Sequence, residues 1–281
     1  MSGMTSMLSK KIDSRLFNKF AQMIDNIAGI HLEENKRTLL SNRLRKRLKE
    51  TGIKSFEEYY SYLEKGEDPG EIDQMLNAVS TNETYFFRNS VHFQALEEYI
   101  IPGLLKNNNS SLKILSAGCS SGEEPYSIAL MAAENGWLRP GRVKITGFDL
   151  NSLMIEAAAA GIYDSKKFRQ TDEKYLRKYF NPVNENKYEL DKNIRTGVGF
   201  SKKNLIKDKI AGEYDIILCR NVMIYFNKDN QKKVIGKFYE ALKPGGFLII
   251  GHSESLYFLD QRLKYKKIME APVYYKPGSL P

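Results

Sequence analysis

Histidine and cysteine are scarce in this sequence, and their scarcity excludes several kinds of active site. The 281 residues include three histidines and two cysteines, Cys119 and Cys219. Two cysteines cannot build a disulfide framework, and no Cys/His cluster has the spacing of metal ligands. A zinc site or a histidine-based triad is therefore poorly supported, and we expect no metal. His252 follows a predicted strand and is expected to be structural.

Long hydrophobic runs are also absent. No apolar stretch approaches the ~20 residues that span a bilayer, and the N-terminus lacks a signal-peptide core. With 42% hydrophobic and 27% charged residues, the composition is that of a folded protein rather than a disordered chain. We expect a cytoplasmic protein without membrane insertion, with one large α/β domain and one small domain. The oligomeric state is left open, with a monomer as the default expectation.

The net charge of +9 is unevenly distributed. Residues 1–50 contain eleven Lys/Arg and five Asp/Glu, whereas residues 51–84 contain two and eight. Between Lys36 and Lys49 there are seven basic residues and no acidic residue. Such a run is ordinarily a solvated helix face. Helix surfaces that add stability, however, normally combine positive and negative side chains at i, i+4. The pattern favours one basic docking surface for an acidic partner over a general nucleic-acid tail. The predicted docking residues are Arg43, Arg45, Lys46, Arg47 and Lys49.

Residues 1–84 are expected to form a small all-α domain. Apolar residues recur at three- and four-residue spacing between Phe17 and Ile27, as on one buried helix face. In the next segment leucine recurs every fourth residue from Leu40 to Leu48. The helices predicted after the first one are Glu33–Glu50, Phe56–Lys65 and Glu71–Val79.

Strands and helices alternate from about residue 112, which predicts a mostly parallel sheet in a domain of residues 85–281. Two late strands near Tyr265–Met269 and Val273–Lys276 predict an antiparallel hairpin at one edge. The other predicted strands are Leu112–Leu115, Val143–Asp149, Val198–Phe200, Tyr214–Cys219 and Phe247–Gly251. The predicted helices between them include Glu124–Asn135, Ser152–Ala160 and Asn230–Leu242.

A glycine-rich turn between the first strand and its helix, Ser116–Ser127, suggests a cofactor. Gly118 and Gly122 permit backbone conformations that a Cβ would penalise, and they let a ligand approach closely. A turn that binds a pyrophosphate avoids carboxylates. Glu123 and Glu124 therefore favour a cationic ligand such as S-adenosylmethionine over NAD or ATP. The same acids could instead only complement the helix macrodipole.

Ligands of such sheets lie across the carboxyl ends of the strands, so the residues there are candidates for binding. Asp149 ends the second strand, where a carboxylate accepts hydrogen bonds from both ribose hydroxyls or caps the next helix. The third strand leads to Asn204 and Leu205, which suit the edge and the face of an adenine. Asn221 follows the fourth strand within an apolar run, and a buried amide needs a bonding partner.

Several motifs together resemble the CheR family, the chemotaxis receptor glutamate methyltransferases. The turn Lys243–Gly246, Lys-Pro-Gly-Gly, is similar to the usual connection into the fifth strand of class I S-adenosylmethionine-dependent methyltransferases. The resemblance implies a class I (Rossmann-like) methyltransferase domain after a small all-α domain, with a small antiparallel β-subdomain near residues 183–196. The other matching segments are Ser80–Arg88, Ser121–Ser127, Cys219–Phe226 and Gly251–Glu254.

The resemblance also implies the reaction and its residues. The methyl group of S-adenosylmethionine passes to glutamate carboxylates on the cytoplasmic helical bundle of chemotaxis receptors, leaving methyl esters and S-adenosylhomocysteine. A glutamate of pKa ~4.3 is already ionised, so it needs no general base. Arg88 and Tyr225 are candidates for orienting it, although Arg88 could instead hold the cofactor's carboxylate. With Gly118 from the turn, the implied cofactor contacts are Asn82, Thr84, Arg88, Glu124, Asp149, Asn204, Leu205, Asn221 and Val222.

Two other functions are compatible with parts of the sequence. A nucleic-acid methyltransferase would share the fold and the basic charge. Amino-methylating DNA enzymes, however, carry Asp/Asn-Pro-Pro-aromatic after the fourth strand, and the segment Asn221–Tyr225 has no proline. The second alternative is a non-enzymatic sensor or scaffold that binds the cofactor, and the intact strand-end residues count against it.

Overall fold

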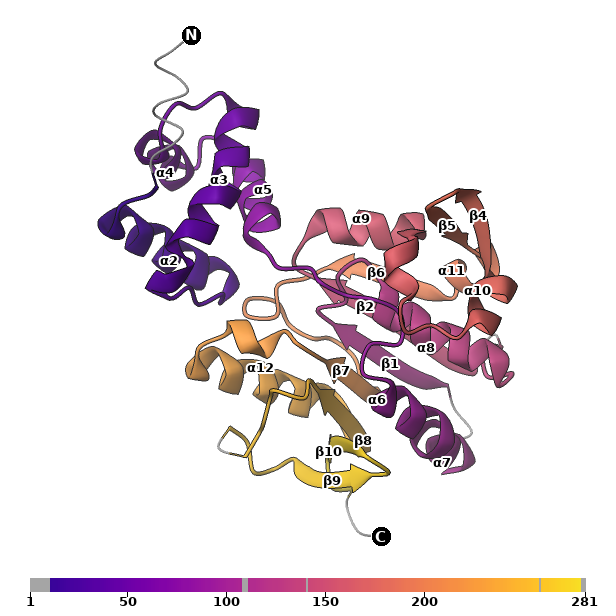
Figure 1. Cartoon of the computed structure of the whole chain (residues 1–281). Coiled ribbons are helices and arrows are strands. Elements are labelled where there is room, and N and C mark those ends of the chain that lie inside the picture. The colour runs from indigo at the N-terminus through magenta and orange to yellow at the C-terminus, as the bar shows by residue number, and fades with distance from the viewer. Residues whose placement is uncertain (1–10, 108–110, 140, 258, 279–281) are drawn as a thin grey trace.

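The structure is a computed structural model that describes residues 11–107, 111–139, 141–257 and 259–278. Over these residues the chain forms a helical N-terminal part and a larger part built on a sheet, joined by the segment that follows α5 (Figure 1). No helix in the described ranges is long and apolar enough to cross a membrane.

The helices of the N-terminal part pack around one apolar core. The side chains of Asp13, Ser55 and Asp68 accept hydrogen bonds from backbone N–H groups at the starts of three of these helices. The two apolar stripes predicted from the sequence lie in this core, where Phe20 and Leu44 are fully buried. The elements are α2 (Ser14–Ala28), η1 (Glu34–Lys36), α3 (Arg37–Thr51), α4 (Phe56–Lys65) and α5 (Pro69–Val79).

The larger part contains a seven-stranded sheet in the order β6-β2-β1-β7-β8-β10-β9. Neighbouring strands are parallel from β6 to β8, whereas β10 is antiparallel to both β8 and β9. The predicted parallel sheet with a late antiparallel hairpin is thereby confirmed. The strands are β1 (Leu112–Ala117), β2 (Val143–Asp149), β6 (Val198–Lys202), β7 (Tyr214–Cys219), β8 (Leu242–Ile250), β9 (Lys264–Ile268) and β10 (Ala271–Tyr275).

Helices cover both faces of this sheet with apolar side chains. Successive residues of a strand point to opposite faces, so Ile114 of β1 belongs to one core and Leu115 to the other. The first core includes α8 (Glu123–Glu134), and the second includes α12 (Lys228–Ala241). Further helices of this part are α6 (Ser90–Ala95), η2 (Leu96–Ile100), α7 (Ile101–Asn107), α9 (Ser152–Ala160) and η4 (Met223–Tyr225).

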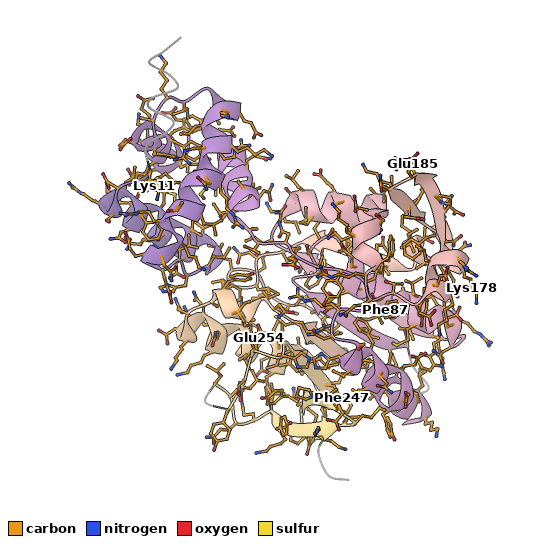
Figure 2. The ribbon with its side chains drawn as sticks, in the orientation of Figure 1. Lys11, Phe87, Lys178, Glu185, Phe247 and Glu254 are labelled. Carbon is orange, nitrogen blue, oxygen red and sulfur yellow. The ribbon has the colours of Figure 1, made fainter. Side chains whose placement is uncertain are left out.

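A second, three-stranded antiparallel sheet in the order β3-β5-β4 is inserted between α9 and β6. It begins at Ile162, earlier than the segment 183–196 in which a small β-subdomain was expected, and residues 192–196 are helical instead. In Figure 2, Phe87 lies within the packed interior while Glu185, between β4 and β5, projects at the outer edge. The inserted elements are β3 (Ile162–Asp164), η3 (Ser165–Phe168), α10 (Glu173–Tyr179), β4 (Phe180–Asn184), β5 (Lys187–Leu190) and α11 (Lys192–Thr196).

The N-terminal part contacts the larger part at the carboxyl ends of the strands. Ile30, just after α2, forms an isolated antiparallel bridge with Phe226, and the amide of His31 donates to the carbonyl of Tyr225 at 2.7 Å. The carboxylate of Asp25 accepts a hydrogen bond from the side-chain amide of Asn230 at 3.0 Å. These contacts bring the end of α2 and the turn after it to the edge of the sheet where a ligand is expected.

Candidate active site

One cavity of about 710 Å³ opens between the N-terminal part and the carboxyl ends of the strands. Its volume lies within the range typical of small-molecule sites, about 300–1,000 Å³. All the residues predicted for cofactor binding or catalysis line this cavity. They are Asn82, Thr84, Arg88, Gly118, Glu124, Asp149, Asn204, Leu205, Asn221, Val222 and Tyr225.

Glu124 is oriented by two neighbours, and neither role was predicted. One carboxylate oxygen of Glu124 accepts from the hydroxyl of Ser116 at 2.7 Å, and the other pairs with Arg220 at 3.1 Å. The Arg220 side chain is almost fully buried, and burial lowers the pKa of its guanidinium. It also donates to the carbonyl of Arg88. Arg220 therefore links the glycine turn to the segment that contains Arg88, and its position after an apolar strand was the available sequence signal.

Asp149 bonds the glycine-rich turn through Ser120. Its carboxylate accepts from the amides of Ser120 at 2.7 Å and Asn151 at 2.8 Å. The alternative that Asp149 caps the next helix is wrong, because the side chain of Asn151 accepts from the amide of Met154 and caps α9 instead. Burial raises the pKa of the Asp149 carboxyl. The hydrogen bonds that it accepts from backbone N–H groups partly oppose that rise. The Asp149 side chain lies at the cavity wall, available to a ligand.

Asn221 occupies a strained turn that Glu254 supports. The backbone of Asn221 has φ of 59°, and its side-chain Oδ1 is buried without a partner among the described residues. The Glu254 carboxylate accepts from the amides of Gly251 at 2.6 Å, Asn221 at 3.1 Å and Ile224 at 3.2 Å. Burial raises the pKa of Glu254. Glu254 belongs to the motif Gly251–Glu254, from which this role was not predicted.

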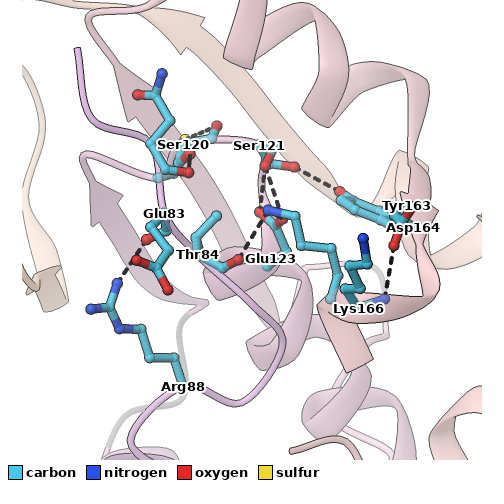
Figure 3. A network of polar contacts seen from close by, with 12 residues as sticks. Glu83, Thr84, Arg88, Ser120, Ser121, Glu123, Tyr163, Asp164 and Lys166 are labelled. Carbon is cyan, nitrogen blue, oxygen red and sulfur yellow. Dashed lines mark hydrogen bonds and ion pairs between the residues drawn. The ribbon is translucent and has the colours of Figure 1, made fainter. Parts of the chain in front are cut away.

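The segment 80–89 crosses the cavity and will be called the strap. The carbonyl of Asn82 accepts from the hydroxyl of Ser120 at 3.1 Å, and the amide of Phe87 donates to the hydroxyl of Ser127 at 2.9 Å. Figure 3 shows Glu83, Thr84 and Arg88 beside the glycine turn that contains Ser120. The strap thus brings Asn82, Thr84 and Arg88 to the cavity.

Comparison with protein families accounts for almost the whole chain. Residues 15–80 match the model of the CheR methyltransferase all-alpha domain, and residues 82–273 match that of the CheR methyltransferase SAM-binding domain. This chain belongs to the CheR family. It is a chemotaxis receptor methyltransferase with S-adenosylmethionine as cofactor, and the nucleic-acid and scaffold alternatives are set aside.

Individual relatives agree with this membership of the CheR family. The chemotaxis protein methyltransferase of Borreliella burgdorferi is 38% identical over 250 residues, covering 85% of this chain and 87% of the relative. That of Salmonella typhimurium is 35% identical over 264 residues, covering 90% of each. Among solved structures, a TehB-like SAM-dependent methyltransferase from Corynebacterium glutamicum matches with TM-score 0.37 and 15% identity, over 66% of this chain and 94% of that one. At that score the likeness supports no further conclusion.

The cavity residues fit the cofactor of the CheR family. S-adenosylmethionine has an ammonium group, a carboxylate, ribose hydroxyls and an adenine. The cavity offers a carboxylate at Asp149, a guanidinium at Arg88 and, at Asn221, an amide oxygen that no described residue bonds. Leu205 and Val222 supply apolar surface.

Asn204 lines the cavity and also bonds within the protein. Its side-chain nitrogen donates to the carbonyl of Ile27 at 2.6 Å, and its side-chain oxygen accepts from the amide of Ile206 at 2.9 Å. These bonds join α2 to the loop after β6 at the cavity wall. The contact of Asn204 with the edge of an adenine stays a prediction.

Two of the predicted docking residues of this CheR chain face inward. Arg47 pairs with the buried Glu71 at 2.6 Å, so its prediction as a docking residue is wrong. Arg43 lines the cavity and donates to the carbonyl of Val79 and to the hydroxyl of Thr81. Burial lowers the pKa of Arg43, and the neighbouring Tyr225 opposes that change. Lys46 and Lys49 are exposed, and Arg45 is half-buried.

Proposed function

We propose that the cavity binds S-adenosylmethionine and aligns it with a glutamate side chain of a chemoreceptor. The observation that carries this proposal is the convergence of strap and strand-end residues on one cavity in which Asn221 Oδ1 has no partner within the described part of the chain. Asp149 would accept from the ribose hydroxyls, and Asn221 Oδ1 from the ammonium group. The product would be a glutamyl methyl ester, and the enzyme would act in the cytoplasm, where the receptor bundle lies.

The chain's own residues provide alignment rather than base catalysis. The cofactor supplies the methyl group, bonded to a sulfonium. A glutamate of pKa ~4.3 is ionised at neutral pH, so no proton has to leave it. Basic side chains in the cavity lining, Lys36, Arg43, Arg88 and Lys203, favour a carboxylate there. Holding nucleophile and methyl donor in near-attack geometry is worth about 7–11 kcal/mol.

The substrate can be tested directly. The protein would be incubated with methyl-labelled S-adenosylmethionine and, separately, with receptor, DNA or RNA. We expect label on the receptor alone and its release as methanol in alkali, because esters hydrolyse there and methylated amines do not. Alkali-stable label on the receptor, or label on nucleic acid, would contradict the proposal.

Arg88 and Tyr225 can be separated by binding and turnover measurements. Arg88→Met is expected to weaken S-adenosylmethionine binding by about 10- to 100-fold, because charge-assisted hydrogen bonds contribute about 1.5–3 kcal/mol. Tyr225→Phe is expected to leave that affinity unchanged and to lower kcat. Calorimetric titration with the cofactor, followed by receptor methylation at saturating cofactor, measures both. If Arg88→Met raised only the KM for receptor, Arg88 would orient the substrate instead.

The N-terminal part is proposed as the receptor-docking domain, here assigned residues 1–84 with the methyltransferase domain at 85–281. On α3 the exposed Lys46 and Lys49, together with Arg45, form the basic part of this surface. Leu39 and Ile224 line the cavity while remaining 42% and 46% exposed, so they could contact apolar side chains around the substrate glutamate. An acidic helical bundle complements both features.

Reversing charge on α3 tests the docking surface. The double variant Lys46→Glu/Lys49→Glu is expected to raise the KM for receptor by roughly 3- to 10-fold at low salt, since each exposed ion pair is worth about 0.2–1 kcal/mol. Cofactor affinity should not change. The matched control, Lys264→Glu/Lys266→Glu on the exposed strand β9, alters net charge equally. Equal KM values in the two variants would rule out a local role for α3.

A further inference from the structure

We infer that Lys167, on the inserted segment, is a positioning residue that fixes the strap over the cofactor cavity. Its ammonium group lies 2.8 Å from the carboxylate of Glu123 and donates to the carbonyl of Thr84 at 2.9 Å. Its own carbonyl accepts from the amide of Phe86 at 3.0 Å. One residue therefore bonds the strap at two points and the first turn of α8 at a third. The inference rests on the proposed position of the cofactor in this cavity.

Glu123 is the buried partner that keeps Lys167 in place. The Glu123 side chain is fully buried, and both of its oxygens accept from the hydroxyl of Ser121 at 2.8 Å. It is absent from the cavity lining, unlike the adjacent Glu124. An ionised carboxylate at such a depth needs a cation, and Lys167 is the cation that pairs with it. The two consecutive acids of the turn therefore face in different directions, with Glu124 toward the cofactor and Glu123 toward the insertion.

Aromatic packing holds the same stretch of the strap. The ring of Phe86 stacks on Phe168 with centroids 5.1 Å apart, and it meets Tyr163 and Phe180 edge-on at 4.9 and 5.2 Å. Those three rings come from β3, η3 and β4. Figure 3 shows Thr84 near Glu123, with Ser121 pointing toward both Glu123 and Tyr163.

The position of the cofactor contacts on the strap follows from these bonds. Thr84 is bonded through its own carbonyl, and Asn82 and Arg88 lie two residues before and four residues after it. If the bond to the Thr84 carbonyl were lost, the cavity residues of the strap would all still be present, but their positions would change. Lys167 is not among the residues that line the cavity, so we assign its effect to the geometry of residues that are.

The test uses the full chain and four variants, with Asp149→Asn as a fifth that reports on the proposed cofactor site. Lys167→Met should weaken S-adenosylmethionine binding at least about 10-fold and lower the melting temperature, because Glu123 loses its cation. The KM for receptor, measured at saturating cofactor, should stay within about twofold of wild type. Lys167→Arg should recover part of the cofactor affinity. Lys166→Met, at the exposed neighbouring lysine, is the matched control and should change neither quantity.

The fourth variant separates positioning from stability. Lys167→Met/Glu123→Gln removes the uncompensated charge, so the melting temperature should recover while cofactor affinity stays low, since the bond to the Thr84 carbonyl is still missing. Full recovery of affinity in this double variant would overturn the inference, as would wild-type affinity in Lys167→Met. If Asp149→Asn weakens binding while Lys167→Met does not, the inference fails and the proposed site stands. If neither variant weakens binding, both fail.

Discussion

Replacing Arg47 with methionine is expected to lower the free energy of unfolding of the N-terminal part by about 3–5 kcal/mol, because Glu71 is then left buried and charged without a cation to pair with it. Arg47 donates to both oxygens of Glu71, at 2.9 and 2.6 Å, and the hydroxyl of Tyr59 donates to the same carboxylate at 2.5 Å. This bonding raises the pKa of Arg47 above its ordinary value. Denaturant unfolding followed by circular dichroism measures the loss.

Lys46 provides the control for this experiment. It lies next to Arg47 on α3, but its side chain is 76% exposed and its ion pair with Glu50 spans 3.8 Å. Lys46→Met should therefore change stability by no more than about 0.5 kcal/mol. An Arg47→Met protein as stable as Lys46→Met would show that the buried pair contributes nothing net. The double variant Arg47→Met/Glu71→Met should recover much of the loss, because removing both charges leaves no unpaired ion.

Changing Asp149 to asparagine is expected to weaken S-adenosylmethionine binding by about 10²-fold, or about 2.8 kcal/mol. Hydrogen bonds to a charged acceptor contribute about 1.5–3 kcal/mol each. In addition, the side-chain nitrogen of asparagine would face a backbone N–H group that now donates a hydrogen bond to the carboxylate. Isothermal titration calorimetry measures the change. Glu156→Gln on the exposed side of α9 removes the same charge nearby and should leave affinity unchanged.

The pH dependence of binding gives this prediction a second readout. Burial raises the pKa of Asp149, so the wild-type carboxylate gains its proton at a higher pH than an exposed aspartate does. Cofactor affinity should therefore fall as the pH drops from neutrality toward that raised pKa, and this part of the fall should be missing in Asp149→Asn. Parallel pH profiles for the two proteins would exclude Asp149 as the titrating group.

Elements with strong local signals could be predicted from the sequence. The predicted bounds Phe56–Lys65, Val143–Asp149 and Tyr214–Cys219 coincide with α4, β2 and β7. The apolar periodicity of an element and the residues that begin or end it are local features of the sequence. The predicted bounds of these three elements therefore agree with the structure. Strand β3 was missed because three residues are too few to show a period, and β8 begins at Leu242, before the Lys-Pro-Gly-Gly turn.

The roles of several polar residues could not be predicted, because their partners are distant in sequence. In the sequence Arg47 belongs to a basic run that is typical of a solvated helix face. Its partner, Glu71, is 24 residues away and could not be inferred from that run. The side-chain amide of Asn204 bonds Ile27, 177 residues earlier. Residue type and position at a strand end indicated the cavity, whereas the direction of each side chain depended on the tertiary structure.

The strap has a consequence for chimeric enzymes built from two CheR relatives. A splice at residue 84 would take Asn82 and Thr84 from one parent and Arg88, Ser120 and Lys167 from the other. The donor's strap would then have to match a foreign turn and a foreign insertion. Joining the parents at Ser80, directly after α5, keeps the strap with the turn and the insertion that hold it. The exchangeable module is therefore shorter than the helical domain predicted from composition.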